Sequence, residues 1–336
     1  MGSVHARRFL CRCLTPDPAS PPFNWGIYCT SSNCDSNPAN TYAKWEGYIG
    51  KTIPIKPYFW VMPGSNFNAI SSILDGFRSS GSVPLLMLTT ADYNNPNDWQ
   101  NWTPATFAAG NHDTLLETWA SQMSSWNHPI ILRPWWEANN ISTLPNMVPW
   151  MARVYYNGNL ISDEDDWIAG WRHIHDIFNS YPNNSTNIKW MWSMLSWPAP
   201  GNPILMNTIY PGSDYVDIMG FEFYHAEQTG YTDPYQDPLI VNAYQQLCTC
   251  DYTKPIAIAE SGILARVYKA SWIGNALSVQ KIQSHYPRVD TVFLWSTPVP
   301  GGTLEFDDTI DDRNATVAAL QSNGFKNGYS TARSHG

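Results

Sequence analysis

The sequence lacks long apolar runs and clusters of basic residues, and each absence excludes a class of function. No apolar run approaches the roughly 18 residues that a membrane-spanning helix needs. Only 19 Lys and Arg residues stand against 28 Asp and Glu residues, which gives a formal net charge of −9, and they form no basic stripe. An acidic chain of this kind argues against nucleic acid and anionic membrane surfaces as partners.

Charged residues of both signs are scarce, at 14% of the 336 residues, while hydrophobic residues make up 43%. A chain of this length buries a core large enough to be stable without cross-links. The sequence also contains no G-x-x-x-x-G-K-[ST] and no G-x-S-x-G motif. We therefore expect neither a phosphate-binding P-loop nor the nucleophile elbow of a serine hydrolase.

Cysteine is rare, and its six residues fall in three close pairs: Cys11/Cys13, Cys29/Cys34 and Cys248/Cys250. The pairs favour disulfides, with free thiols as the alternative, because the spacings do not match the C-x2-C hooks of common zinc sites. Five N-glycosylation triplets begin at Asn101, Asn140, Asn183, Asn184 and Asn314. Together these features favour a secreted protein, although the apolar part of "RRFLCRCL" is too short for a clear signal peptide.

Eight short apolar runs follow a proline-rich segment, residues 1–22, that we interpret as a flexible tail. Each run has the length of a buried strand. They cover residues 23–28, 56–62, 83–89, 129–135, 188–193, 215–221, 255–259 and 291–295.

Patterns with helical spacing lie between most of these runs, over residues 37–50, 66–81, 111–126, 163–181 and 271–286, with a last helix near 313–323. Strands that alternate with helices indicate a parallel sheet. Eight such strands predict a single α/β domain over residues 23–336, a (β/α)8 TIM barrel. A doubly wound sheet is the main alternative, but no strand is followed by G-x-G-x-x-G.

Active sites of (β/α)8 barrels lie at the carboxyl ends of the strands. The residues that the sequence places there are Trp60, Asp92, Trp136, Glu137, Glu222, Tyr224, Glu260 and Trp295. Carboxylates together with tryptophans fit sugar chemistry: glycosidic bonds need two carboxyl groups, and sugar C–H faces stack on aromatic rings. The alternatives are that Glu137 is an ordinary loop residue, and that Tyr224 and Trp295 only pack in the core.

Two neighbours of Glu137 also have predicted orientations. Trp135 and Trp136 cannot both point into the site, because neighbouring residues of a strand face opposite sides, so we expect one of them to pack in the core. Arg133 would share the inward side with Glu137, and we expect it to pair with a carboxylate.

His173 and His175 lie two apart on a predicted helix and diverge, so we expect no metal site there.

Several longer stretches resemble glycoside hydrolase family 26, the β-mannanase family. "PIILRPWWEANN" is similar to its R-P-x-H-E-M-N-G signature, and "WRHIHDIF" with "IKWMWS" to its following helix and strand. "YPGSDYVDIMGFEFYH" resembles Y-P-G-D-D-Y-V-D-h-h-G-h-D-x-Y, the most specific of these motifs, and "IAIAESG" the strand that carries E-x-G. The resemblance covers the chain from about Trp25 to Trp295.

The resemblance implies a retaining endo-β-glycanase with the fold expected above. By position, Glu137 would be the acid/base and Glu260 the nucleophile. Tyr224 would hydrogen-bond the nucleophile, and Trp295 would form the floor of the sugar site. The leading substrate is β-1,4-mannan, with mixed-linkage β-glucan and β-1,3-xylan as alternatives within the family. A different class of function is a carbohydrate-binding barrel without activity.

Two residues depart from the family pattern. Trp136 stands where the family has His, and Glu222 stands where it has Asp. We expect these changes to affect the substrate more than the type of reaction. We also expect a monomer that acts without a cofactor or a metal.

Overall fold

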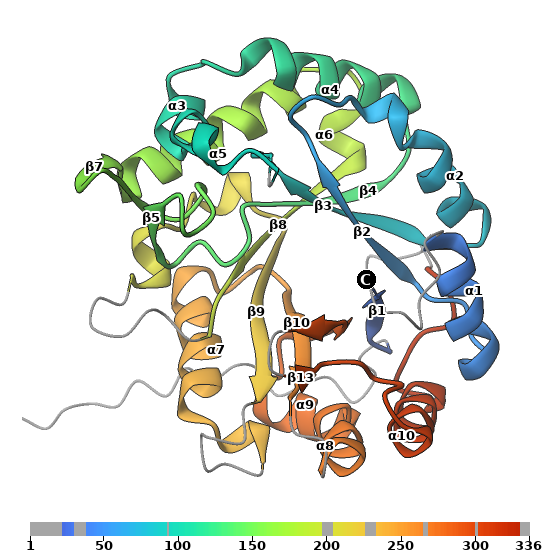
Figure 1. Ribbon diagram of the computed structural model, residues 1–336. Coiled ribbons are helices and arrows are strands. Elements are labelled where there is room, and N and C mark those ends of the chain that lie inside the picture. Colours follow the sequence, from blue (N-terminus) through green and yellow to red (C-terminus); the bar gives the residue numbers. More distant parts are fainter. Residues whose placement is uncertain are drawn as a thin grey trace, which may run out of the picture.

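The structure is a computed structural model that describes residues 22–29, 38–92, 94–196, 204–225, 233–264, 268–299 and 302–329. Nearly all of the predicted tail, residues 1–22, therefore lies outside the described residues. Eight parallel strands form one sheet that curves into a nearly closed barrel (Figure 1). They are β1 (Asn24–Cys29), β2 (Ile55–Val61), β3 (Val83–Thr89), β4 (Ile130–Pro134), β8 (Ile188–Met194), β9 (Ile218–His225), β10 (Ile256–Ile263) and β11 (Val289–Ser296).

Helices lie around the outside of this sheet and connect successive strands (Figure 1). They are α1 (Pro38–Ile49), α2 (Ser71–Ser79), α3 (Pro104–Ala108), α4 (Asp113–Trp126), α5 (Glu164–Asn179), α6 (Asn184–Asn187), α7 (Pro238–Cys250), α8 (Lys269–Ala276), α9 (Val279–His285) and α10 (Ile310–Gln321). The predicted (β/α)8 barrel is confirmed. In the described part of the chain, no helix is both long enough and apolar enough to cross a membrane.

All eight predicted strands are present, and the sixth shows the largest shift. It was expected over residues 215–221, but Ser213–Tyr215 form a 3-10 turn and the strand runs from Ile218 to His225. Glu222 and Tyr224 therefore lie within strand β9 instead of after it. The backbone hydrogen bonds of the sheet hold these two residues, so their positions are fixed more firmly than they would be in a loop.

The connections contain elements that the sequence did not reveal. A small sheet of β5 (Ile141–Leu144), β6 (Arg153–Tyr156) and β7 (Asn159–Ser162) lies between β4 and α5, and a hairpin of β12 (Pro298–Val299) and β13 (Gly302–Thr303) follows β11. Helix α7 was not predicted, and the helix expected over 271–286 is divided into α8 and α9. Helix α10 begins three residues earlier than expected because Thr309 and Asp312 cap it reciprocally.

Tryptophan fills much of the core. Of the tryptophans that the structure describes, nine are less than 2% exposed, so most of these indoles serve packing rather than sugar binding. They are Trp25, Trp45, Trp119, Trp135, Trp150, Trp167, Trp171, Trp190 and Trp192.

The sequence favoured disulfides without choosing among the possible connectivities, and Cys248 and Cys250 are not part of one. Both residues are thiols within helix α7, where positions two apart point to different sides. Cys29 is disulfide-bonded, whereas Cys11, Cys13 and Cys34 lie outside the described residues. Asn184 is 1% exposed and its amide donates hydrogen bonds to two backbone carbonyls, so this triplet is closed to glycosylation.

Glycine allows the first and second strands to approach at the seam of the barrel. A Cβ atom on Gly26 would lie 2.5 Å from the carbonyl oxygen of Ile55 and 2.8 Å from the ring of Phe293. Strands β1 and β2 are the two ends of the sheet order, so this contact is where the barrel closes. A side chain at position 26 would push the ends of the sheet apart.

We predict that Gly26→Ala lowers the free energy of unfolding by about 1–3 kcal/mol, because the added methyl has no space. The matched control is Gly47→Ala in α1, where a Cβ meets nothing within 4 Å. That change should stabilise the protein by up to about 1 kcal/mol through helix propensity. Denaturant unfolding measures both variants, and equal stabilities would contradict the proposed close approach at the seam.

Candidate active site

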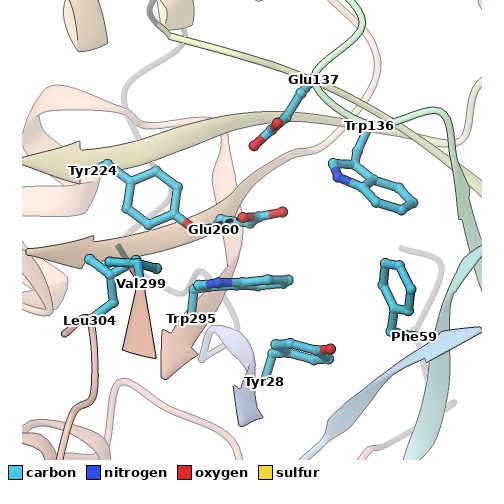
Figure 2. Close-up of a pocket in the computed structure, with 9 residues that line it drawn as sticks. All are labelled: Tyr28, Phe59, Trp136, Glu137, Tyr224, Glu260, Trp295, Val299 and Leu304. Atoms are coloured by element: carbon cyan, nitrogen blue, oxygen red, sulfur yellow. Dashed lines mark hydrogen bonds between the residues drawn. The ribbon is translucent and has the colours of Figure 1, made fainter. Parts of the chain in front are cut away.

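A pocket of about 360 Å³ opens at the carboxyl ends of the barrel strands (Figure 2). Its polar groups come from two glutamates and a tyrosine, and its walls are aromatic and aliphatic. The lining residues are Tyr28, Phe59, Trp136, Glu137, Tyr224, Glu260, Trp295, Val299 and Leu304. Five of the eight residues predicted for the site are therefore brought together in one cavity.

Both carboxylate oxygens of Glu260 are held by hydrogen bonds. Nη1 of Arg133, from the interior of β4, donates to Oε1 at 2.6 Å. The hydroxyl of Tyr224, from β9, donates to Oε2 at 2.6 Å. Arg133 is 1% exposed and is itself oriented by Nε, which donates to Oγ of Ser193 at 2.7 Å. The predicted pairing of Arg133 with a carboxylate is confirmed, and the arrangement fixes the direction of the Glu260 side chain.

Tyr224 remains a hydrogen-bond donor to high pH. Burial raises the pKa of its hydroxyl well above the usual value, and the charge of Glu260 raises that pKa further. A neutral phenol beside a carboxylate donates a strong hydrogen bond.

Glu137 reaches the pocket because the chain departs from strand geometry. Strand β4 ends at Pro134, and Trp135 and Glu137 adopt left-handed backbone angles, with φ values of 50° and 62°. Such angles are rare for residues other than glycine and often occur at functional sites. The N–H of Glu137 donates to the carbonyl of Ser193 at 3.1 Å, which ties the turn to β8.

This turn also separates the two tryptophans, although not through strand alternation as we expected. Trp135 is fully buried, and its indole donates to Oγ1 of Thr90 at 2.7 Å. Trp136 lines the pocket, with its ring edge-on to Phe59 at 5.4 Å between centroids. One indole therefore serves the core and the other serves the site.

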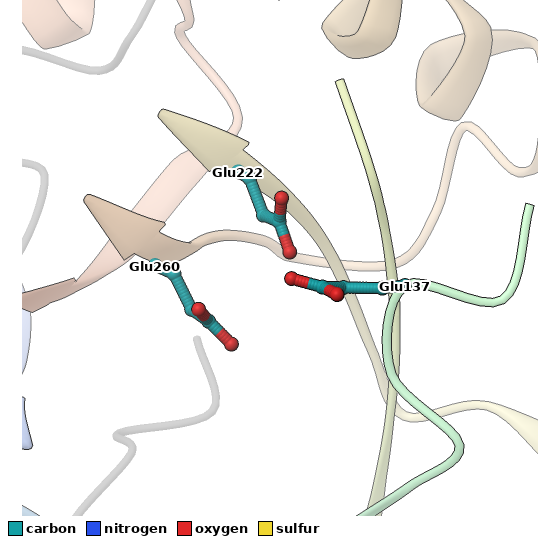
Figure 3. A group of neighbouring side chains, drawn as sticks. All are labelled: Glu137, Glu222 and Glu260. Atoms are coloured by element: carbon teal, nitrogen blue, oxygen red, sulfur yellow. The ribbon is translucent and has the colours of Figure 1, made fainter. Parts of the chain in front are cut away.

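Burial raises the pKa of Glu137, and the charge of Glu260 adds to this rise. A hydrogen bond with Glu222 and the charge of Arg133 oppose it to a smaller extent. Within the described residues, Glu137, Glu222 and Glu260 form a group in which one carboxyl oxygen of each lies within 4.8 Å of the others (Figure 3). A protonated and an ionised carboxyl group can therefore stand close together in the pocket.

The aromatic floor of the pocket is a pair of stacked rings. Trp295 lies on Tyr28 with 4.1 Å between the ring centroids and 19° between their planes. In Figure 2 the pair lies directly below Glu260, with the indole toward the carboxylate. A flat indole beside a carboxylate can hold the apolar face of a sugar ring against the reacting group.

No family model matches the chain. One curated relative, mannan endo-1,4-β-mannosidase A and B of Caldalkalibacillus mannanilyticus, is 24% identical over 147 residues, which is 44% of this chain and 25% of that protein. The match thus spans about a quarter of the length of this relative. A family 26 β-mannanase from Bacteroides ovatus has a TM-score of 0.64 at 14% identity, over 94% of each chain. A modular endo-β-1,4-mannanase from Cellulomonas fimi has a TM-score of 0.60 at 16% identity, over 90% of this chain and 73% of that one.

The chain has the fold of glycoside hydrolase family 26. The resemblance that the motifs predicted is thereby confirmed at the level of the fold, with alignments that extend over most of the chain. The roles of single residues in the family 26 resemblance are not tested by these comparisons and stay predictions.

Three residues that the sequence placed at the ends of the strands lie outside the pocket lining. Trp60 shares a strand face with Tyr58, whose ring packs on Phe77 of α2, and its indole donates to Oγ of Ser65. It therefore faces the helix layer. Asp92 accepts the N–H of Asn94 at 2.8 Å in the turn after β3.

Glu222, the third of these residues, is 1% exposed and lies behind the carboxyl groups of Glu137 and Glu260.

Four lining residues were missed from the sequence. Tyr28 and Phe59 lie near the ends of β1 and β2, so the rule that found the other residues could have found them. Val299 and Leu304 belong to the β12–β13 hairpin and the residue after it, and no sequence signal marked them.

We predict that Arg133→Met lowers the free energy of unfolding at neutral pH by about 3–5 kcal/mol, because the buried Glu260 loses its cation. The matched control is Arg153→Met, which breaks a partly exposed pair with Glu164 and should cost about 1 kcal/mol or less. Denaturant unfolding of both variants is the measurement. Equal losses would show that the ion pair of Glu260 is not the buried contact described above.

Proposed function

We propose that this protein is a family 26 glycoside hydrolase that cleaves a β-linked polysaccharide with retention of configuration. The observation that carries the proposal is that the two pocket carboxyl groups are close neighbours, with one oxygen of each within 4.8 Å of the other, which agrees with the short separation in a retaining site. Retaining glycosidases hold their carboxyl groups about 5–5.5 Å apart, whereas inverting enzymes leave about 6.5–9.5 Å for a water molecule.

In the first step Glu260 attacks the anomeric carbon and forms a glycosyl ester. Arg133 and Tyr224 each hold one oxygen of Glu260, which keeps the nucleophile aimed before the sugar arrives. Glu137 gives a proton to the leaving oxygen as the glycosidic bond breaks. Its raised pKa suits this role, because a general acid must carry its proton near neutral pH.

In the second step a water molecule attacks the same carbon from the side of the departed chain. Glu137, now ionised, takes the proton of that water, and Glu260 leaves as a carboxylate. The stacked pair of Trp295 and Tyr28 holds the sugar ring through both steps.

The leading substrate is β-1,4-mannan. The relatives from Caldalkalibacillus mannanilyticus, Bacteroides ovatus and Cellulomonas fimi are all described as mannanases or mannosidases. Trp136 replaces the polar histidine of the family pattern with an apolar wall beside Phe59. Mixed-linkage β-glucan and β-1,3-xylan therefore remain substrates to be compared with mannan, and cleavage within the polysaccharide chain is part of the proposal.

The site of action is proposed to be outside the cell, where polysaccharides are found. The disulfide bond of Cys29 agrees with an oxidising compartment. The monomeric state stays a prediction.

We predict that the wild type releases reducing ends from one of mannan, galactomannan, β-glucan or xylan, and that Glu260→Ala lowers this rate by about 10⁴-fold or more. Glu137→Ala should lower it by about 10²–10⁴-fold, but should keep most activity on a dinitrophenyl glycoside, whose leaving group needs no proton. The matched control is Glu117→Ala, an exposed position on α4, which should act like the wild type.

Two outcomes would overturn parts of this proposal. Activity that survives in Glu260→Ala would exclude Glu260 as the nucleophile. Polysaccharide binding by the wild type without any release of reducing ends would favour the second candidate function, a carbohydrate-binding barrel.

A further inference from the structure

A third carboxyl group lies directly behind the two proposed catalytic ones. Glu222 is 1% exposed and comes from β9. The register of β9 and β10 shifts just before Glu260, and this shift places Glu260 beside Glu222 on neighbouring parallel strands. Figure 3 shows the carboxyl groups of Glu222 and Glu137 pointing toward each other.

The carboxyl groups of Glu137 and Glu222 lie close together, with one oxygen of each within 4.8 Å of the other, and a hydrogen bond between them bears on the pKa of both. An ionised carboxylate has only acceptor atoms, so two of them cannot form such a bond. A hydrogen bond between the two groups therefore requires a proton on one of them.

The charges around the pair lead to the same conclusion. The titratable groups that face Glu222 are Glu137 from the turn after β4, Glu260 from β10, Arg133 from β4 and Tyr224 from β9 itself. Of the described residues, only Arg133 brings a positive charge here, and it is bound to Glu260. Three ionised carboxyl groups would leave two uncompensated charges in a buried site, and a shared proton reduces this to one.

The contacts of Glu222 indicate where the proton rests. Among the described residues, none donates a hydrogen bond to its Oε1, and a neutral carboxyl group tolerates an unpartnered oxygen better than a carboxylate does. Burial raises the pKa of Glu222 well above the usual value, and the bond with Glu137 raises it further, while the same bond lowers the pKa of Glu137. The proton of the pair thus rests between Glu222 and Glu137, within reach of both.

We propose that Glu222 is a positioning residue that holds the acid/base Glu137 in place and shares one proton with it. This inference rests on the proposed function. The proton passes along the hydrogen bond to Glu137, which gives it to the leaving oxygen while Glu260 forms its bond to the anomeric carbon. Water later returns a proton to the pair as its oxygen bonds to that carbon and Glu260 leaves.

The sharing keeps the net charge of the site constant. Before the first step Glu260 and the pair carry one negative charge each, and Arg133 carries one positive charge. After the step the pair carries two negative charges, but Glu260 is a neutral ester. The pair of anions is then a stronger base toward water than Glu137 would be alone, because like charges raise the pKa of each other.

The extra methylene of glutamate makes this contact possible. The family pattern has Asp at position 222, and an Asp side chain is one carbon shorter. The hydrogen bond between Glu137 and Glu222 is thus a property of this chain that the resemblance does not supply.

The test is the pH dependence of kcat/KM for Glu222→Gln. The amide keeps the shape and donates to Glu137, but it has no proton to share and carries no charge. We expect the basic limb of the profile to shift to lower pH by about one unit or more. The reason is that ionisation of Glu137 no longer places a second anion beside an existing one, so the pKa of Glu137 falls. On the alkaline side kcat/KM should fall about tenfold or more, with a smaller loss at acidic pH.

The matched control is Phe223→Leu, one residue along β9, whose side chain packs on Tyr235, Trp272 and Tyr286. Its basic limb should not move. A Glu222→Gln variant that loses activity equally at every pH would overturn the proposal, since a structural role alone would act in this way. If a thermal melt shows that Glu222→Gln does not fold, Glu222→Asp is the second variant and should shift the limb in the same direction.

Infrared titration distinguishes this proposal from the proposed function. If the wild type hydrolyses no glycan, the function fails, but the shared proton remains measurable as the C=O band of a protonated carboxyl group. In the wild type the band should still be present at neutral pH. As the pH is raised, the band of Glu222→Gln should be lost at a lower pH than that of the wild type. A wild type in which the band titrates at the same pH as in the variant would exclude a shared proton.

Discussion

The ion pair between Arg133 and Glu260 is the interaction on which the site depends. It joins β4 to β10 through the interior of the barrel at 2.6 Å, and Ser193 of β8 and Tyr224 of β9 each add a hydrogen bond to it. A buried ion pair is costly unless its geometry is good and its remaining atoms are bonded. Here four neighbouring strands, β4, β8, β9 and β10, supply partners for both oxygens of Glu260 and for Nε and Nη1 of Arg133, while Nη2 is buried without one in the part of the chain that the structure describes. The same contacts that make the charges tolerable also fix the direction in which Glu260 can react.

The carboxyl groups of the site differ because their surroundings differ. Glu260 has a guanidinium, so it can remain an anion inside the barrel. Glu137 and Glu222 lack a cation of their own and face each other, so burial and mutual repulsion favour a proton on the pair. In the proposed mechanism, the division into nucleophile and acid/base thus follows from the position of one arginine.

The fold was predictable from the sequence because its signals are repeated and local. Eight apolar runs separated by helical patterns give a barrel even when a boundary is wrong by several residues, as for β9. The residues at strand ends followed from the same rule, and this found Glu137, Glu260, Tyr224 and Trp295. Their roles still depend on the family 26 resemblance.

What the sequence could not show depends on non-local geometry. Phe59 and Trp60 are neighbouring aromatic residues of β2 and face opposite sides of the sheet. The side that faces the pocket carries Phe59, so Phe59 lines the pocket and Trp60 does not. The left-handed angles at Trp135 and Glu137 replace the strand alternation on which our argument about the two tryptophans depended. The position of Glu260 beside Glu222 depends on the register shift in β10, which no residue pattern predicts.

The central claim is that Glu260 forms a covalent bond to the sugar within reach of Glu137. The most direct measurement is to treat the protein with a 2-deoxy-2-fluoro glycoside that carries a good leaving group, and then to locate the label by peptide mass spectrometry. The account predicts one sugar attached to Glu260, and no label in Glu260→Ala. A label on another residue would contradict the account, and so would turnover of the natural glycan with inversion of the anomeric centre.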